Sequence, residues 1–534
     1  MQTLEAVPES RIERTHPPPR PQRRRSWILA TAAITALALL LVGWFLVDHY
    51  WPYRYRNVKP VLESVLASKV TVTEYHRTYF PQPGFVAEGL ILRRTSAPDL
   101  PPVGSTGKLI VRGRWSDLFL LRNRIQLVDV IDLHVVIPPV GSRANHEDFP
   151  PGSSADFAGP STIVEEFRIH HARLDIQRTN GGLYSFPIDT LVIRNLQQGR
   201  AISYTVDMQN AMPAGHILAN GSFGPLDPKN LGATPLSGDF TFTQVQLSQI
   251  GELHGTLSAS DHFQGTIAAI SGAATTNVPD FAVSSGHPTA LSGVVNFTIN
   301  ALNRDIQLQT IELKTGASAI QAHGAILGPG AMMTNLDFSV THGRMQDLLR
   351  PFVRNKVPLA GPLSLSGHAT LLPAQNGAAF LQRLHVTAAL TAPAETMTDH
   401  ATEQSLTDFS HRAAGNPSKS NPDDANTEVD VLSSISGHAS LANGIATTRD
   451  LRVQFPGAST TLAGTWNLHS TAAHLTGDLN MDTDISHVTT GFKSLLLKPL
   501  APFFKRRKAG AVIPVAFTGT SGNYKVSQDI VGRK

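Results

Sequence analysis

Apolar and polar residues alternate with a period of two along most of this sequence, and this pattern most constrains how the chain can fold. The alternation is clearest in the runs Ile202/Tyr204/Val206/Met208, Val295/Phe297/Ile299, Leu336/Phe338/Val340 and Leu451/Val453/Phe455. Polar residues such as Asp337 and Gln454 stand between the apolar ones, and Gly, Pro, Asn or Ser bounds each run. Because successive side chains of a strand point to opposite faces, each run predicts a strand with one apolar face and one hydrated face.

Helical periodicity is confined to three short segments, residues 58–66, 345–353 and 491–497. None of them is long enough to cover a sheet as the helices of α/β proteins do. An apolar sheet face without a covering layer must curl on itself or bind something apolar. We therefore predict a mostly β chain, built as a long antiparallel meander with a few short helices.

Two weak repeats accompany the strands. In the first, the alternation passes through a glycine, as at Gly221, Gly324, Gly367, Gly437 and Gly464. A glycine inside a strand predicts a bulge, a bend or close packing of the backbone. In the second, a short amphipathic segment precedes such a strand, at residues 245–251 and 345–349.

The N-terminal region carries a single apolar segment without charge, from Trp27 to Val47. At ~1.5 Å per residue this segment matches the thickness of a bilayer core, and tryptophan favours the membrane interface. We therefore predict a transmembrane signal anchor at residues 26–48, after a basic cytoplasmic tail at residues 1–25. The flanks of this anchor are Arg23, Arg24, Arg25, Trp27 and Trp44. The competing interpretation, a cleaved signal peptide, is disfavoured by the length of the apolar segment.

The amino-acid composition indicates in which compartment the part after the anchor works and which kinds of chemistry it can carry out. The 534 residues include no cysteine, which excludes a disulfide framework, cysteine catalysis and cysteine metal sites. A large translocated body without disulfides suits the periplasm of a Gram-negative bacterium, so we expect a bacterial inner-membrane protein with its bulk in the periplasm. The net charge of +4 predicts no nucleic-acid partner. No motif for catalysis, cofactor or metal binding is recognisable, so we expect neither an enzyme nor a cofactor.

Both ends of the body resemble AsmA-like proteins, the family of TamB-like and YhdP-like bridge-type lipid carriers. After the anchor, residues 58–72, 85–92 and 115–138 follow that family's order of short helix, strand pair, double-leucine segment and strands ending near a proline. Near the C-terminus, residues 492–497, 513–520 and 526–529 are similar to its closing phrase, except that Tyr524-Lys525 stands where a proline is usual. The resemblance implies a curled β-groove that carries phospholipid between the inner and outer membranes, with an envelope protein as a possible partner.

The resulting organisation is a β-groove at residues 49–390, a disordered insertion at 391–428 and a second groove segment at 429–534. From the alternation we expect these side chains to face lipid: Phe297, Ile299, Leu336, Phe338, Val340, Val453 and Phe455. Two other functions stay open at this point. One is an assembly factor for outer-membrane proteins, with a polypeptide client, and the other is a membrane-tethered enzyme acting on envelope glycans.

Overall fold

The computed structural model divides the chain into two compact units, Met1–Ser64 and Val65–Lys534. The residues it describes are 42, 49, 51–139, 141–148, 162–178, 181–197, 199–227, 230–328, 333–354, 357, 359–373, 378–398, 433–481, 512–520 and 525–528. Helix α2 (Tyr55–Val65) starts in the first unit and confirms the helix predicted near residues 58–66. Among the described residues no helix is both long and apolar enough to cross a membrane. The predicted span at 26–48 falls almost wholly outside them.

The second unit is one large sheet, described as 26 strands. The strands are β1 (Ser68–Thr71), β2 (Glu74–Thr78), β3 (Gly84–Arg94), β4 (Gly104–Arg112), β5 (Arg124–Ile137), β6 (Ile163–Gln177), β7 (Leu183–Leu196), β8 (Ile202–Ala211), β9 (Ala214–Phe223), β10 (Pro235–Gln246), β11 (Leu253–His254), β12 (Thr256–Thr266), β13 (Ala269–Val283), β14 (Thr289–Asn300), β15 (Asp305–Thr315), β16 (Ser318–Leu327), β17 (Met333–Arg344), β18 (Leu359–Ala360), β19 (Pro362–Leu371), β20 (Leu384–Met397), β21 (Ser433–Ala442), β22 (Ile445–Phe455), β23 (Ala458–Asn467), β24 (Ala473–Met481), β25 (Val512–Gly519) and β26 (Lys525–Gln528).

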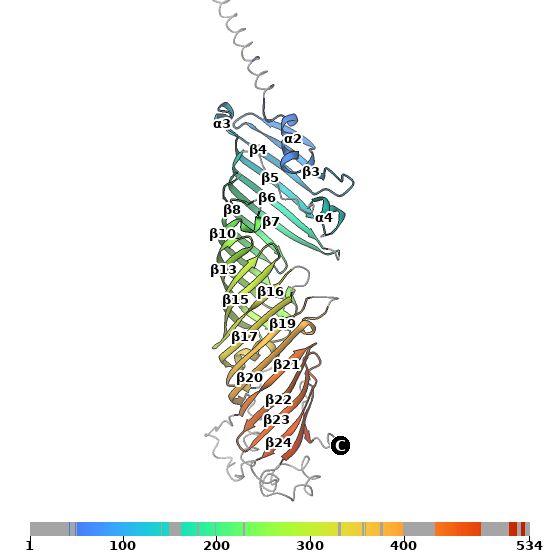
Figure 1. Ribbon diagram of the computed structural model, residues 1–534, viewed down its shortest axis with the longest axis vertical. Helices are drawn as coiled ribbons and strands as arrows, with labels where there is room; N and C mark the ends of the chain where they lie inside the picture. The colour runs from blue at the N-terminus through green and yellow to red at the C-terminus, as the bar shows by residue number, and fades with distance from the viewer. Residues whose placement is uncertain are drawn as a thin grey trace, which may run out of the picture. The chain divides into compact units, whose positions relative to one another are not determined.

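Short helices interrupt the sheet of the second unit. They are α3 (Trp115–Phe119), α4 (Arg143–Asp148), η1 (Leu231–Ala233), η2 (Leu247–Ile250), α5 (Met345–Leu349), η3 (Arg350–Phe352) and α6 (Phe380–Arg383). Elements α5 and η3 confirm the helical segment predicted at 345–353, whereas 491–497 lies outside the described residues. The mostly β fold and the large curled sheet are therefore as predicted (Figure 1).

Neighbouring strands of the described sheet pair antiparallel, many of them through tight turns, with one departure from the predicted meander. Asn443 and Gly444 both have positive φ, the geometry of a two-residue hairpin turn, and they join β21 to β22. Strands β5 and β6, in contrast, pair in parallel, with Arg124 opposite Ile163. A parallel pair needs a long crossover instead of a hairpin, and the chain between Ile137 and Ile163, which includes α4, provides it.

The weak repeat of amphipathic segments corresponds to a real structural repeat. In the first copy, η2 follows β10, and β11 and β12 form one strand broken at Gly255, opposite a bulge between Val278 and Phe281 of β13. In the second copy, α5 follows β17, and β18 and β19 are broken at Gly361, opposite a bulge between Ala392 and Glu395 of β20. Each bulge contains a proline, Pro279 or Pro393, which suits a position without a ladder hydrogen bond.

A similar sequence motif begins two of the short helices. Gly113-Arg114-Trp115-Ser116-Asp117-Leu118 begins α3, and Gly343-Arg344-Met345-Gln346-Asp347-Leu348 begins α5. In the second, an Asp347 carboxylate oxygen accepts hydrogen bonds from the Ala317 backbone N–H (2.8 Å) and the Ser318 hydroxyl (3.2 Å). The aspartate thereby fastens the short helix to the β15–β16 turn.

The glycines predicted inside strands mark close backbone approach. At Gly464 φ is +150°, and a Cβ atom there would lie 2.0 Å from the His474 carbonyl oxygen. At Gly221 a Cβ would lie equally close to the Ser237 carbonyl oxygen. No side chain fits at such a distance, so these positions require glycine.

The predicted insertion needs a corrected boundary. Strand β20 continues to Met397, so the N-terminal part of the range 391–428 is ordered sheet. The alternation alone did not predict this end of the strand, because it breaks at Pro393 in the bulge between Ala392 and Glu395. Residues 399–432 lie outside the described residues, where disorder remains a prediction.

Candidate functional site: the apolar face of the sheet

Apolar side chains are aligned across the strands as well as along them. One row runs from β14 to β21 through partners in direct register: Phe297, Leu308, Gly324, Leu336, Ala369, Val386 and Leu441. The next row contains Val295, Ile311, Ala322, Phe338, Gly367, Ala388 and Ala439. We call the side of the sheet that carries these rows the apolar face. Bulky residues are interspersed with glycine and alanine, so the face is uneven.

Most of the apolar face is neither packed nor fully exposed. Except for Phe297, the members of both rows are half-buried, whereas Asp337, His368 and Ser440 on the opposite face are exposed. Among the described elements no helical layer covers these rows. Within the described residues, the half-burial of the apolar face goes with a curled sheet and not with a covering helix (Figure 1).

Helix α5 closes the apolar face at one place. Its Met345 forms a buried cluster with Leu363 of β19 and Ala392 of β20, and Leu348 and Leu349 pack against this cluster. Leu365, opposite Val340 in register, also packs there. The face is thus sealed next to α5 and half-buried further along the strands.

The seven side chains expected to face lipid fall into two groups. Five are half-buried on the sheet: Ile299, Leu336, Phe338, Val453 and Phe455. Val340 and Phe297 are only 3% and 9% exposed. Val340 is therefore part of a packed region and does not line open space, which alternation alone did not reveal. The anchor flanks Arg23, Arg24, Arg25, Trp27 and Trp44 lie outside the described residues.

The opposite face is lined by paired histidines and aspartates. The Nε2 or Nδ1 atom of each histidine lies close to a carboxylate oxygen, in the pairs His216–Asp207 (2.6 Å), His262–Asp239 (2.9 Å), His368–Asp337 (2.8 Å) and His438–Asp450 (2.6 Å). Hydrogen bonds from the His438 side chain and backbone hold the pKa of Asp450 below its ordinary value. These pairs give many of the scattered histidines a cross-strand structural role.

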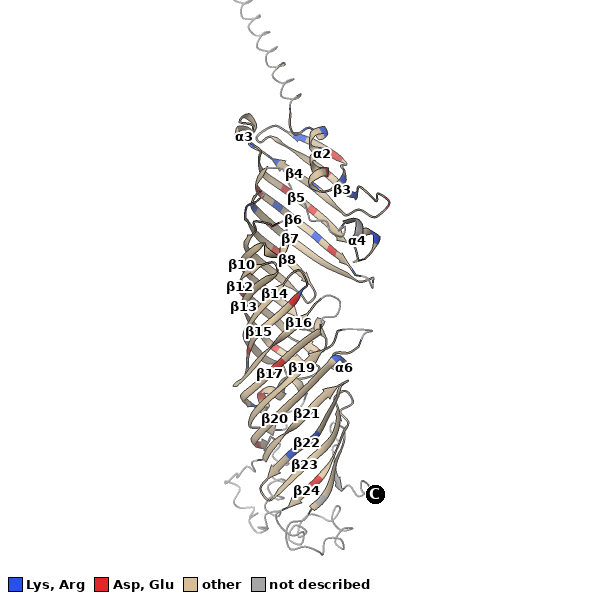
Figure 2. Ribbon diagram, in the orientation of Figure 1, with Lys and Arg blue, Asp and Glu red and all other residues tan. Residues whose placement is uncertain are grey.

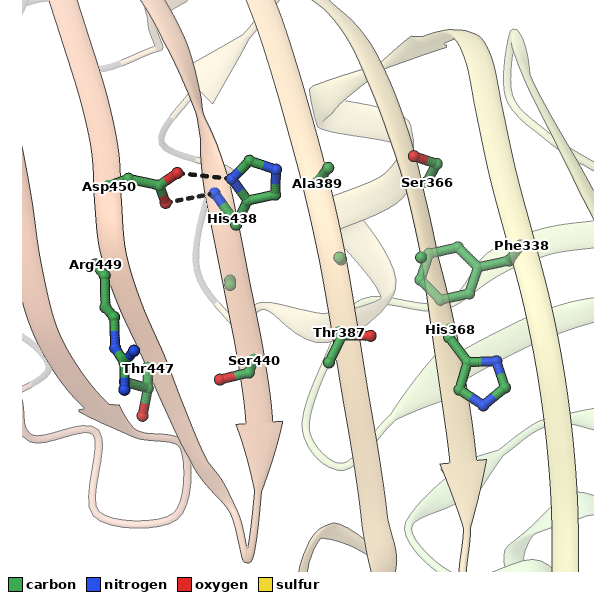
Figure 3. A pocket seen from close by; sticks show the side chains of 13 residues that line it. Phe338, Ser366, His368, Thr387, Ala389, His438, Ser440, Thr447, Arg449 and Asp450 are labelled. Atoms are coloured by element: carbon green, nitrogen blue, oxygen red, sulfur yellow. Dashed lines mark hydrogen bonds and ion pairs between the residues drawn. The ribbon is translucent and has the colours of Figure 1, made fainter.

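A hollow of about 840 Å³ lies between β17 and β22, and polar-face side chains line it together with Phe338, Gly367, Ala388 and Ala439 of the apolar rows. Figure 3 shows His438 and Asp450 joined on one side of it, with Arg449, Thr387 and His368 nearby. The hollow is open to solvent, and its histidine and charged side chains are exposed. It lacks the enclosed, convergent groups of an active site.

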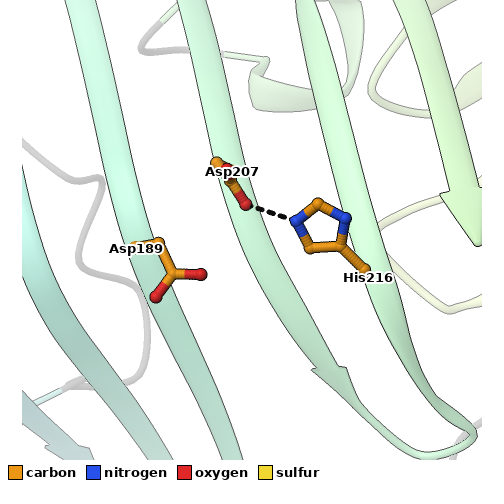
Figure 4. Close-up of side chains that lie close together, drawn as sticks. All are labelled: Asp189, Asp207 and His216. Atoms are coloured by element: carbon orange, nitrogen blue, oxygen red, sulfur yellow. Dashed lines mark hydrogen bonds and ion pairs between the residues drawn. The ribbon is translucent and has the colours of Figure 1, made fainter.

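A second polar cluster joins Asp189, Asp207 and His216, whose ligand atoms lie within 4.8 Å of one another (Figure 4). The three residues come from β7, β8 and β9, so no sequence spacing could have revealed them. Asp189 sits where the β7–β8 register shifts, which turns its carboxylate towards the pair. Two carboxylates and an imidazole could share a cation, but the same arrangement is an ordinary His–Asp pair with an exposed acid beside it.

Glu395 is the most unusual ionisable group. Its side chain is fully buried, and both carboxyl oxygens lack a hydrogen-bond partner among the described residues. In the β20–β21 pairing, the register partner of Glu395 is Ser433. Ser433 lies two residues before Ile435, which packs against the cluster around Met345, so the two residues share one face of β21. The Glu395 carboxyl therefore points to the apolar face. In the first structural repeat the equivalent position is Phe281. Burial raises the pKa of Glu395 to about 7.

Comparison with known proteins adds no identification: no protein-family model matches the chain, and no curated protein is significantly similar to it.

Proposed function

We propose that this protein is an AsmA-like, membrane-anchored lipid carrier of the bacterial envelope. The apolar segment at residues 26–48 holds it in the inner membrane, and the sheet extends in the periplasm. The apolar face forms a groove in which phospholipid acyl chains move between the inner and outer membranes. This transfer supports lipid homeostasis in the outer membrane and the integrity of the envelope.

One observation carries this proposal: the half-buried apolar face repeats from strand to strand. Each strand offers an incoming acyl chain similar contacts, because the rows through Phe297 and Phe338 continue in register to β21. Burial of a methylene group contributes about 0.8 kcal/mol. An acyl chain that exchanges equivalent contacts at every strand meets no deep free-energy minimum, so it can slide along the groove.

The size of the sheet is compatible with transfer over a long distance. With 26 strands, a few of them collinear, and ~4.8 Å between neighbours, the sheet extends over roughly 110–120 Å. The resemblance of both ends of the body to AsmA-like proteins points to the same function. No nucleotide site is recognisable in the sequence, so we expect movement to be passive or driven by a partner.

A photo-crosslinking amino acid tests the proposal at two neighbouring positions. Phe338 is on the apolar face and Asp337, next to it, is exposed on the polar face. In the full chain in cells, a probe at Phe338 should capture phospholipid, and the matched probe at Asp337 should not. Val453 and Gln454 form a second such pair on β22.

The same experiment separates the alternative function. An assembly factor for outer-membrane proteins would use the apolar face for a polypeptide. The probe at Phe338 would then yield a protein adduct of high mass and no lipid. Equal lipid labelling at Phe338 and Asp337 would contradict a one-sided groove.

A further inference from the structure

Two loops at one edge of the sheet expose large apolar side chains. In the β2–β3 loop Phe80 is 89% exposed. At the end of α3, the consecutive residues Phe119, Leu120 and Leu121 are 77%, 60% and 89% exposed. Side chains of this size rarely stand together in water without a partner.

The two loops are neighbours. The Gln82 side-chain amide donates a hydrogen bond to the Gln126 side chain (3.1 Å), and the Gly113 N–H donates to the Pro83 carbonyl oxygen (2.7 Å). These bonds join the β2–β3 loop to both ends of the α3 segment. Phe80 and the residues 119–121 therefore belong to one surface, which we call the apolar rim.

The backbone of the apolar rim holds its side chains outwards. Leu121 has φ +50°, a conformation that a leucine seldom adopts. The Arg122 N–H donates to the Asp117 carbonyl oxygen (2.8 Å), which fixes the turn. Trp115 stacks on Phe119, with 5.8 Å between ring centroids, so the exposed phenyl ring is supported from within the helix.

Charge around the apolar rim is mainly positive. Arg114, Arg122 and Arg124 flank α3, with side chains 45%, 58% and 40% exposed. Asp117 is buried and Glu165 is shared by Arg114 and Arg124, so the accessible charge is basic. In Figure 2 charged residues are dense on the N-terminal strands and sparse on the later ones.

We propose that the apolar rim inserts into the head-group region of an anionic lipid bilayer. Exposed Phe and Leu side chains bordered by arginine have the chemistry of an interfacial membrane contact. The partner is the bilayer that holds the anchor, because β1 begins at Ser68, only about twenty residues after the predicted span. The inference rests on the anchor of the proposed function and is independent of lipid transport.

The absence of cysteine makes a direct test possible, since a single cysteine can be labelled specifically. Full-length Leu121→Cys carrying an environment-sensitive fluorophore is reconstituted into vesicles of phosphatidylcholine and phosphatidylglycerol containing a nitroxide-labelled lipid. Phe80→Cys provides a second position. The matched control is Leu302→Cys, in the β14–β15 turn, where the side chain is also well exposed (58%).

We expect the nitroxide lipid to quench the probes at positions 121 and 80 severalfold more strongly than the probe at 302. Vesicles without phosphatidylglycerol should reduce that quenching, because the arginines lose their counter-charge. Equal quenching at all three positions, or none at 121 and 80, would overturn the inference. Absence of quenching together with lipid capture at Phe338 would refute the apolar rim alone, whereas quenching without lipid capture would refute only the transport function.

Discussion

Replacing Glu395 with glutamine should stabilise the protein at alkaline pH and change little at acidic pH. The carboxyl is fully buried without a partner among the described residues, so its ionised form is disfavoured in the folded state. Its pKa rises from 4.5 to about 7. Well below pH 4.5 the group is neutral in both the folded and the unfolded chain, and it does not affect stability there.

The expected magnitude follows from this shift. As pH rises from 4.5 through 7, the unfolded chain releases the proton while the folded chain retains it, so the free energy of unfolding falls. A shift of about 2.5 pH units at 1.36 kcal/mol per unit gives a loss of about 3 kcal/mol at pH 8.5. At pH 5 the loss is below about 1 kcal/mol. Glutamine has no charge to bury and should remove this pH dependence.

Hydrogen exchange of the full chain in detergent, at pH 5 and 8.5, measures this effect where it arises. In an extended sheet, strands open locally, so peptides from β18 and β20 report on the site better than a global melting temperature. Exchange rates need correction for the intrinsic effect of pH. At pH 8.5 the Glu395→Gln variant should show slower corrected exchange in these peptides than the parent.

Glu312→Gln is the matched control, because Glu312 is exposed on the polar face of β15. It should leave the exchange of β18 and β20 unchanged at both pH values. If Glu395→Gln were no more protected than the parent at pH 8.5, or if the control matched it, the argument from the buried carboxyl would fail.

Three further outcomes are expected. Val340→Asp should bury an unpaired charge at a 3% exposed position, lose several kcal/mol of stability and become sensitive to proteolysis. Phe338→Asp should leave the protein folded, and cells that carry it should have a detergent-sensitive envelope. Comparable protease resistance of the two variants would contradict a sealed region at Val340. Asp347→Ala removes two hydrogen bonds to the β15–β16 turn and should weaken that turn by about 1–3 kcal/mol. The amides of residues 315–318 should then exchange faster. The exposed control Glu312→Ala should leave their exchange unchanged. A phosphatase fused after Lys534 should be active and one fused within residues 1–25 inactive, and the reverse pattern would refute the predicted topology.

Local pattern accounts for what the sequence predicted well. Alternation at Leu336, Phe338 and Leu451 is a property of each strand alone, so strand positions and the division into two faces could be derived without knowing which strands pair. The short helix at Met345 was predictable for the same reason. Gly464 was recognisable as a special position, although its close approach to His474 depends on the neighbouring strand.

Long-range contacts account for what was missed. The parallel pairing of β5 with β6 depends on a crossover that no periodicity encodes. Val340 is buried, and its register partner Leu365 packs against the cluster that brings α5 onto β19 and β20. Glu395 looks like an ordinary polar residue in sequence, and only the bulge beside Pro393 turns it towards the apolar side.

The parallel seam between β5 and β6 has a consequence for how a chain of this design can change length. On the C-terminal side of the seam nearly every strand returns through a turn, so adding or deleting a hairpin leaves the direction of all later strands unchanged. Each hairpin alters the reach of the protein by roughly 10 Å, twice the spacing between strands. The seam has no hairpin to add or remove, because a long crossover joins the parallel strands β5 and β6. Reach can therefore evolve, or be engineered, in steps of one hairpin, with β1–β5 as a fixed base.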